Sequence, residues 1–80
     1  MHEMHLVKDL FEDVLKHAKE NQAHKITKVY LQMGEFTEIN EEVLRFFFKE
    51  KSPGTVLENA ELAIARSPNR ELRLVSFDME

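Results

Sequence analysis

The first five residues, Met1-His2-Glu3-Met4-His5, bring together the groups with the most metal chemistry in the chain. A free amine at Met1, the backbone nitrogen of His2 and the Nδ1 atom of its ring can close two fused chelate rings on one metal ion. The backbone nitrogen of Glu3 can complete a plane of four nitrogens. Such a site needs deprotonated amides and square-planar geometry, which favours Ni(II) or Cu(II) over zinc. The metal must also displace a proton from an amine whose ordinary pKa is about 7.7–8.0, so we expect tighter binding as the pH rises.

The same terminus has a simpler interpretation, in which Met1 is only a start residue and His2 a chance occupant of a frayed chain end. The metal interpretation therefore depends on whether the rest of the chain holds this terminus in place. His5 is the best additional ligand, because it follows His2 by three residues and lies near it if a helix begins early. Clustering of Met1 and Met4 with the two histidines keeps a copper site open as an alternative.

The composition of the 80 residues excludes several classes of protein. The length suits one domain, residues 1–80. A net charge of −4 without a basic stripe argues against nucleic-acid binding, and the absence of cysteine excludes disulfides and thiolate metal sites. No apolar run approaches the roughly 18 residues of a membrane span, and no signal peptide is evident, so we expect a cytoplasmic protein. No pattern of Ser/His/Asp or Cys/His supports a nucleophile, which argues against an enzyme.

A helix is predicted from Glu3 to about Asn21, because apolar residues recur at spacings of three and four. Its apolar stripe consists of Val7, Leu10, Phe11, Val14 and Ala18, widened by Leu6 and Leu15. His17 falls on the polar side and is expected to be solvated. The metal-binding terminus would then be anchored to the first turn of a packed helix.

A strand is predicted from Ile26 to Met33, after a connection that exposes His24. Its residues alternate, so that one face is covered and carries Val29, Leu31 and Met33, and the other is open and carries Lys28, Tyr30 and Gln32. Gly34-Glu35 ends this strand.

A second helix is predicted to begin at Asn40, an N-cap residue followed by two acids. Its end is marked by Lys49 to Lys51 and the breaker Ser52-Pro53-Gly54. Phe46, Phe47 and Phe48 are more apolar surface than one helix stripe can bury, so we expect part of this run to contact a partner or a second copy of the chain.

Two further strands are predicted at Ala60–Ala65 and Glu71–Phe77, joined by the tight turn Ser67-Pro68-Asn69-Arg70 as a hairpin. The fold class is therefore α+β. We expect a small mixed three-stranded sheet with two helices on one face, in the order helix, strand, helix, strand, strand.

With this order established, the chain resembles the nickel-binding domain of the HypA/HybF family of hydrogenase and urease accessory proteins. The start Met1-His2-Glu3 is similar to the family's Met-His-Glu signature. Further similar segments follow in the family's order: Gln22-Ala23-His24-Lys25-Ile26, Met33-Gly34-Glu35, the run from Gly54 to Leu62, and Glu71-Leu72-Arg73-Leu74. No single segment is specific, but five in the right order and spacing are.

The resemblance implies Ni(II) binding through Met1, His2 and Glu3, and docking to a HypB-like GTPase of the [NiFe]-hydrogenase maturation machinery through the same end of the domain. One departure is large. Family members carry a zinc-binding insertion with two Cys-x-x-Cys pairs between the last two strands, where this chain has only the short segment near 67–70. No zinc is therefore expected, and functions that depend on the zinc unit are in doubt.

Three functions remain open on the sequence. The first is a metallochaperone domain that binds Ni(II) at its free N-terminus. The second is a zinc-less interaction module, with a homodimer as one form, in which metal binding is incidental. The third is a copper-binding protein.

Overall fold

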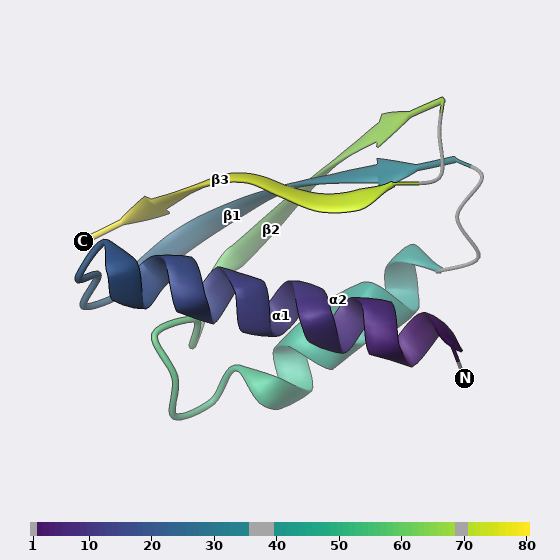
Figure 1. The fold of residues 1–80 in the computed structure, drawn as a ribbon. Helices are drawn as coiled ribbons and strands as arrows, with labels where there is room; N and C mark the ends of the chain where they lie inside the picture. Colours follow the sequence, from purple (N-terminus) through teal and green to yellow (C-terminus); the bar gives the residue numbers. More distant parts are fainter. Residues whose placement is uncertain (1, 36–39, 69–70) are drawn as a thin grey trace.

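The computed structural model describes residues 2–35, 40–68 and 71–80 of the chain, with side chains from His5 onward. Five elements follow one another: α1 (His2–Glu20), β1 (Ile26–Gly34), α2 (Glu41–Lys51), β2 (Glu61–Ser67) and β3 (Leu72–Met79). Both helices lie on one face of a three-stranded mixed sheet (Figure 1). The α+β fold class and the element order predicted from the sequence are confirmed.

The apolar stripe predicted for α1 is the centre of the core. Every residue of this stripe is at most 7% exposed, namely Val7, Leu10, Phe11, Val14 and Ala18. Leu15 packs against the stripe and is partly buried. The prediction that Leu6 widens the stripe was wrong, since its side chain is 52% exposed. At 3.6 residues per turn, Leu6 is rotated by about 100° from Val7, which takes it off the buried face.

The central strand of the sheet is β1, and the order is β2-β1-β3. It pairs in parallel with β2 and antiparallel with β3. Its alternation is as predicted: Val29, Leu31 and Met33 are fully buried, while the residues between them are partly exposed. The prediction that the last two strands form a hairpin was wrong, because β2 and β3 lie on opposite sides of β1 and do not pair with each other.

The end of β1 lies between the end of β2 and the start of β3. Two bonds fix the end of β1 between them: the Gly34 N–H donates to the Glu71 carbonyl at 2.7 Å and the Glu35 N–H donates to the Ser67 carbonyl at 2.8 Å. The four peptide units from Ser67 to Glu71 reach about 13–14 Å when extended. That exceeds the roughly 9.6 Å between strands two positions apart, so the short segment can span the central strand.

The second helix begins as its sequence indicates. The Asn40 side chain accepts a hydrogen bond from the Glu42 N–H at 2.7 Å, and two acids occupy the first turn. Leu44 and Phe48 face the core, and the helix ends where the Ser52 N–H donates to the Phe48 carbonyl. One helix stripe does not bury all three phenylalanines, as expected, since Phe48 is buried, Phe47 is half-buried and Phe46 is 62% exposed. The contact with a partner or a second copy stays a prediction.

An ordered loop leads from α2 into β2. Gly54 adopts a φ of +84° and Asn59 a φ of +66°, conformations that glycine and asparagine tolerate best. The Thr55 hydroxyl donates to the Ser52 carbonyl and accepts from the Leu57 N–H. These bonds hold Leu57 in the core, where it is 1% exposed.

The C-terminus closes the opposite end of the sheet. The Glu80 N–H donates to the Lys25 carbonyl at 2.8 Å, and the His24 N–H donates to the Glu80 carbonyl at 3.2 Å. The start of α1 lies at the other end of the molecule, where β1 and β2 end (Figure 1).

Candidate metal-binding terminus and neighbouring surfaces

The predicted metal site lies at the start of α1. Met1 is outside the described residues, and so are the side chains of His2 and Glu3. The backbone of His2 and Glu3 is described, and it is helical. The first N–H groups of a helix have no partner within the helix, so the backbone nitrogens of these two residues are not used by α1 itself. The buried stripe of α1 begins at Val7, which anchors the first turn to the core.

The other histidines do not build a second metal site. Among the residues whose side chains are described, no three His, Asp or Glu side chains converge as metal ligands. His5 and His24 are exposed, as predicted for His24. The predictions for Met1, His2 and Glu3 therefore stand untested by side-chain geometry, and His5 lies on the same helix one turn after His2.

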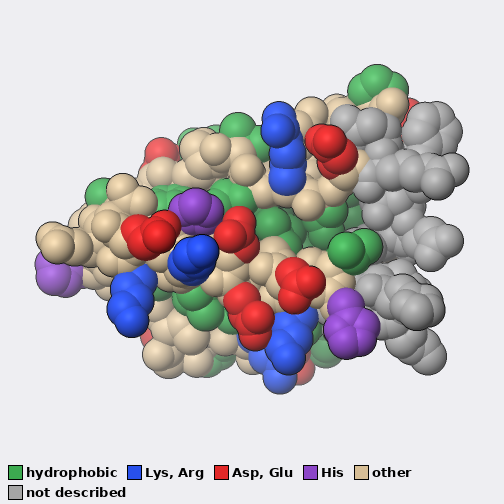
Figure 2. Space-filling view, viewed as in Figure 1, with side chains coloured by type: hydrophobic (Ala, Val, Ile, Leu, Met, Phe, Trp, Pro, Cys, Tyr) green, Lys and Arg blue, Asp and Glu red, His purple; other side chains and the backbone are tan. Residues whose placement is uncertain are grey.

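His17 is held between two carboxylates of its own helix. Its Nε2 atom lies 3.5 Å from Asp13 and its Nδ1 atom 3.4 Å from Glu20. Each nitrogen faces a different acid, so the three groups do not surround a common point. Figure 2 shows acidic and basic side chains intermixed along this outer face of α1, which is the solvated face that the sequence predicts.

The apolar surface that remains exposed on α2 adjoins a groove between the two helices. Phe11 of α1 makes edge-to-face contacts with Phe47 and Phe48, with ring centroids 5.8 and 5.1 Å apart. Outside these contacts, Val43 and Phe46 point into solvent. The groove has a volume of about 510 Å³ and is lined by Lys8, Phe11, Glu12, Leu15, Phe47 and Lys51.

Polar ties connect α2 to β2. Arg45 donates to Glu41 at 3.1 Å and to the Leu62 carbonyl at 3.2 Å, and Arg66 donates to Glu41 at 3.2 Å. The hydrogen bond from Arg45, assisted by the charge of Arg66, holds the pKa of the Glu41 carboxyl below its ordinary value. This cluster of Glu41, Arg45 and Arg66 was not predicted from the sequence. The sequence indicates only the i,i+4 spacing of Glu41 and Arg45, which is common on helix surfaces.

The open face of the sheet is covered by cross-strand polar pairs. Tyr30 donates to Asp78 at 2.9 Å, Lys28 lies 3.3 Å from Glu61, and Arg73 donates to Gln32. The bond to Asp78 raises the pKa of the Tyr30 phenol, and the bond to Glu61 raises the pKa of Lys28. Because these polar side chains pair with one another across the strands, we interpret this face as a solvated surface and not as a binding site.

No helix in the described part of the chain is long and apolar enough to cross a membrane.

A protein-family model matches most of the chain. The family model described as "Hydrogenase/urease nickel incorporation, metallochaperone, hypA" matches residues 1–72. A hydrogenase maturation factor HypA of Legionella pneumophila is 33% identical over 72 residues, which cover 90% of this chain and 64% of that protein. One of Archaeoglobus fulgidus is 42% identical over 65 residues, covering 81% of this chain and 59% of that protein. The chain thus spans less than two thirds of the length of these relatives.

Solved structures share the fold. The solution structure of the Ni metallochaperone HypA from Helicobacter pylori superimposes with a TM-score of 0.76 at 22% identity, covering 91% of this chain and 92% of that one. A second solution structure of a HypA protein gives a TM-score of 0.70 at 26% identity, covering 100% of this chain and 97% of that one.

Proposed function

Because the chain belongs to the HypA family of hydrogenase and urease nickel metallochaperones, we propose that it binds Ni(II) at its N-terminus and delivers the ion during [NiFe]-hydrogenase maturation. Nickel is then the cargo of an accessory protein, and the chain is not an enzyme. The ligands would be the amine of Met1, the backbone nitrogen and ring Nδ1 of His2, and the backbone nitrogen of Glu3. The observation that carries the proposal is the helical start at His2, anchored by the buried stripe of α1.

The helical backbone suits a chelate made of successive backbone nitrogens. A helical ψ of about −42° at His2 keeps the backbone nitrogens of His2 and Glu3 on the same side of the chain, which a five-membered chelate ring between them requires. The N–H groups of His2 and Glu3 lie in the first turn of the helix, so their deprotonation breaks no hydrogen bond of α1.

Charge also favours deprotonated amides over a site made only of side chains. The positive end of the helix dipole lies at the start of α1 and disfavours a cation there by about 0.3–1 kcal/mol. Two amide anions would neutralise the two charges of Ni(II), so the planar complex would not be repelled. An octahedral site made of His2, His5 and the Glu3 carboxylate would retain a net positive charge at the same place.

The surroundings of the terminus support docking of a protein partner at this end. Both helices begin there (Figure 1), and Val43 in the first turn of α2 is exposed. We propose that a HypB-like GTPase docks at this end, in the cytoplasm, and that Phe46 contributes to a contact between two copies of the chain. Phe46 also supports the alternative, an interaction module in which metal binding is incidental.

No zinc is part of this proposal, since the chain has no cysteine. The segment between β2 and β3, where the family resemblance places a zinc-binding insertion, is short. Steps that depend on such an insertion are not part of the proposal.

The test is to block the amine. A chain extended by two residues before Met1 should bind Ni(II) more weakly by on the order of 100-fold, about as much as His2→Ala. Glu3→Ala should retain most of the affinity, whereas Glu3→Pro should not, because proline has no N–H to lose. Calorimetric titration measures the affinity, and a yellow, diamagnetic complex that grows as the pH rises through the range of the amine reports planar nickel.

A matched control carries the same two residues after Glu80, at the opposite end of the sheet, and should bind nickel as the native chain does. Equal affinity of the N-terminally extended and native chains would contradict the amine-based site. Parallel titration with Cu(II) should show tighter binding than Ni(II) at the same nitrogens, whichever of the two metals is the natural cargo.

A further inference from the structure

The outer edge of β2 is the part of the sheet that lies beside α2. In a parallel strand, alternate residues direct both main-chain groups to the same side. The Ser67 carbonyl accepts from Glu35 on the β1 side, and the Leu62 carbonyl accepts from Arg45 on the α2 side. Odd-numbered residues of β2 therefore bond to β1, and Leu62, Ile64 and Arg66 direct their N–H and carbonyl groups outward.

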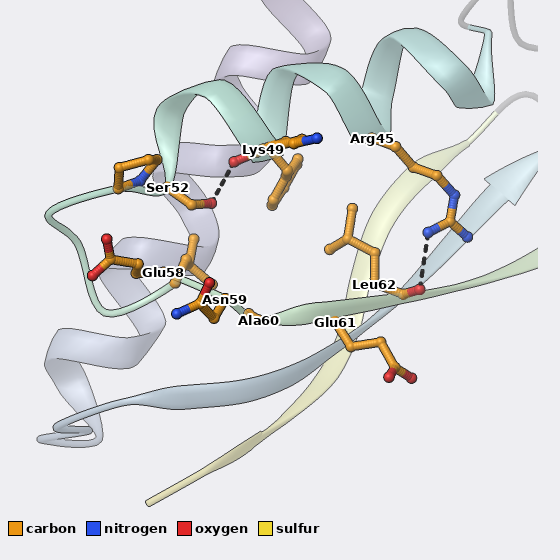
Figure 3. Close-up of a pocket in the computed structure, with 11 residues that line it drawn as sticks. Arg45, Lys49, Ser52, Glu58, Asn59, Ala60, Glu61 and Leu62 are labelled. Atoms are coloured by element: carbon orange, nitrogen blue, oxygen red, sulfur yellow. Dashed lines mark hydrogen bonds between the residues drawn. The ribbon is translucent and has the colours of Figure 1, made fainter.

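These outward groups are largely unused. Among the described residues, only the Arg45 guanidinium bonds to one of them, at the Leu62 carbonyl. No described residue bonds to the outward main-chain groups of Ile64 or Arg66. The Arg45 guanidinium thus occupies the place that the first N–H of an added strand would take (Figure 3).

Positive charge gathers along this edge. Arg45 and Lys49 lie one helical turn apart on α2, and Arg66 lies at the far end of β2. Glu41 is shared between the two arginines. Glu61 points away from α2 (Figure 3) and pairs with Lys28 of β1 at 3.3 Å. The edge therefore presents Arg45, Lys49 and Arg66, with Glu41 shared by the two arginines and Glu58 and Glu61 lining the adjoining hollow.

A hollow continues this edge toward the end of α2. Its volume is about 500 Å³, and its lining includes Arg45, Phe48 and Lys49 of α2 together with Leu57, Glu58 and Glu61. The floor is apolar, because Phe48 and Leu57 belong to the core. Its volume lies within the range of about 300–1,000 Å³ in which proteins bind ligands, and it could accept one or two side chains of a bound segment.

We propose that an extended, acidic segment of a partner protein binds as an additional strand at the outer edge of β2. Its main chain bonds to Ile64 and Arg66 and displaces the Arg45 guanidinium from the Leu62 carbonyl. Its carboxylates pair with the released Arg45 and with Lys49, and an apolar side chain enters the hollow. Strand addition of this kind takes its affinity from main-chain bonds and its specificity from alternate side chains.

The other edge of the sheet does not suit the same segment. A register shift interrupts the pairing of β3 with β1 beside Val75, and an irregular edge pairs poorly with a further strand. The hollow beside β3 is lined by Asp13 and His17 of α1 and by no described lysine or arginine, whereas Arg45 and Lys49 line the hollow beside β2. Charge and regularity therefore both select β2.

The test uses a blocked octapeptide of alternating valine and glutamate, added to isotopically labelled protein without nickel. Amide signals of Leu62, Ile64 and Arg66 should shift on titration, and a peptide of alternating valine and lysine should cause no such shift. Raising the salt concentration should weaken binding, because the pairs at this edge are exposed. Omitting nickel separates this test from that of the metal site.

Two variants locate the contact. Ile64→Pro removes an outward N–H and leaves the bonds from β2 to β1 intact, a position at which an edge strand tolerates proline. The double change Arg45→Gln with Lys49→Gln removes the two cations of α2. Each should weaken peptide binding about tenfold, the effect expected for the loss of one or two hydrogen bonds. The matched control Arg73→Gln removes a cation from β3 and should change nothing.

If Ile64→Pro lowers the folded fraction, measured by circular dichroism, the double variant on α2 decides the test. Equal binding of the two peptides, shifts confined to β3, unchanged affinity of the double variant, or no shift at millimolar peptide would each overturn the proposal.

Discussion

The two helices cover the same sheet in different ways. On α1, five apolar residues of the predicted stripe are buried: Val7, Leu10, Phe11, Val14 and Ala18. On α2, only Leu44 and Phe48 are buried, and Val43 and Phe46 are left in solvent. The polar side chains of α1 that have described partners bond within α1, as His17 does with Asp13 and Glu20.

The polar side chains of α2 reach the sheet. Glu41 pairs with Arg66, and Arg45 bonds to the Leu62 carbonyl. We infer that α1 is fixed by burial, which leaves its first turn available for a metal, whereas α2 is fixed by fewer buried residues together with an N-cap and polar ties. Its remaining apolar surface is then available for protein contacts.

The largest effect should come from removing buried leucines. Leu10→Ala in α1 and Leu44→Ala in α2 should each lower the free energy of unfolding by about 2–5 kcal/mol, because each leaves a cavity in the core. Phe46→Ala should change it by no more than about 0.5 kcal/mol, since the ring is mostly exposed. Urea denaturation followed by circular dichroism measures all three.

Phe46→Ala should instead shift self-association toward the monomer, measured by sedimentation at several concentrations. Loss of stability in Phe46→Ala comparable to that in Leu44→Ala would show that the outward face of α2 is part of the core. The distinction between the two helices would then fail.

Removing a side-chain bond at the end of a helix should lower stability by a smaller amount, and by more in α2 than in α1. Asn40→Ala removes the acceptor for the Glu42 N–H and should cost about 1 kcal/mol of stability. Asn21→Ala removes a side-chain bond to the His17 carbonyl at the end of α1. It should cost less than Asn40→Ala, because the buried stripe already holds α1. Equal losses on thermal unfolding would contradict the idea that α2 depends more on its cap.

The smallest effect concerns acid. The pKa of Glu41 is lower in the folded chain than its ordinary 4.5, chiefly through the bond from Arg45. Its ionised form therefore stabilises the folded chain above pH 4.5, and this contribution is lost as the pH falls through the lower, folded-state pKa. Urea denaturation between pH 7 and pH 3 should show a shallower loss of stability in Glu41→Gln than in the native chain.

Arg66→Gln should reduce the same pH dependence only in part, because Arg45, the larger cause, remains. The effect is small in every case, since these side chains are exposed to solvent. A native chain and a Glu41→Gln variant with parallel pH profiles would show that the tie between α2 and β2 contributes nothing.

The sequence predicted most of the fold because the periodicities were clear. The stripe of α1, the alternation of β1 and the Asn40 cap each rest on short-range patterns that the structure confirms. The pairing of the last strands was wrong, because proximity in sequence and a Pro-Asn turn favour a hairpin. The strand order instead follows the apolar strand β1. Its residues Val29, Leu31 and Met33 are buried, and the central position gives β1 a neighbouring strand on each side.

The two candidate sites also differ in how far the sequence predicts them. The chelating terminus is visible in the sequence because its ligands are adjacent. The cationic edge of β2 is not, since Arg45 and Arg66 are brought to one carboxylate only by the fold. Long-range pairs of this kind leave no periodic signal in a single sequence.

The central position of β1 also bears on how fast the chain folds. Every residue of β1 that pairs with β2 or β3 finds its partner beyond an intervening helix in the sequence, so no strand pair can close as a local hairpin. Folding rates fall as contacts become less local. The sheet should therefore form slowly for a chain of this length, and β2 and β3 should join β1 in one cooperative step.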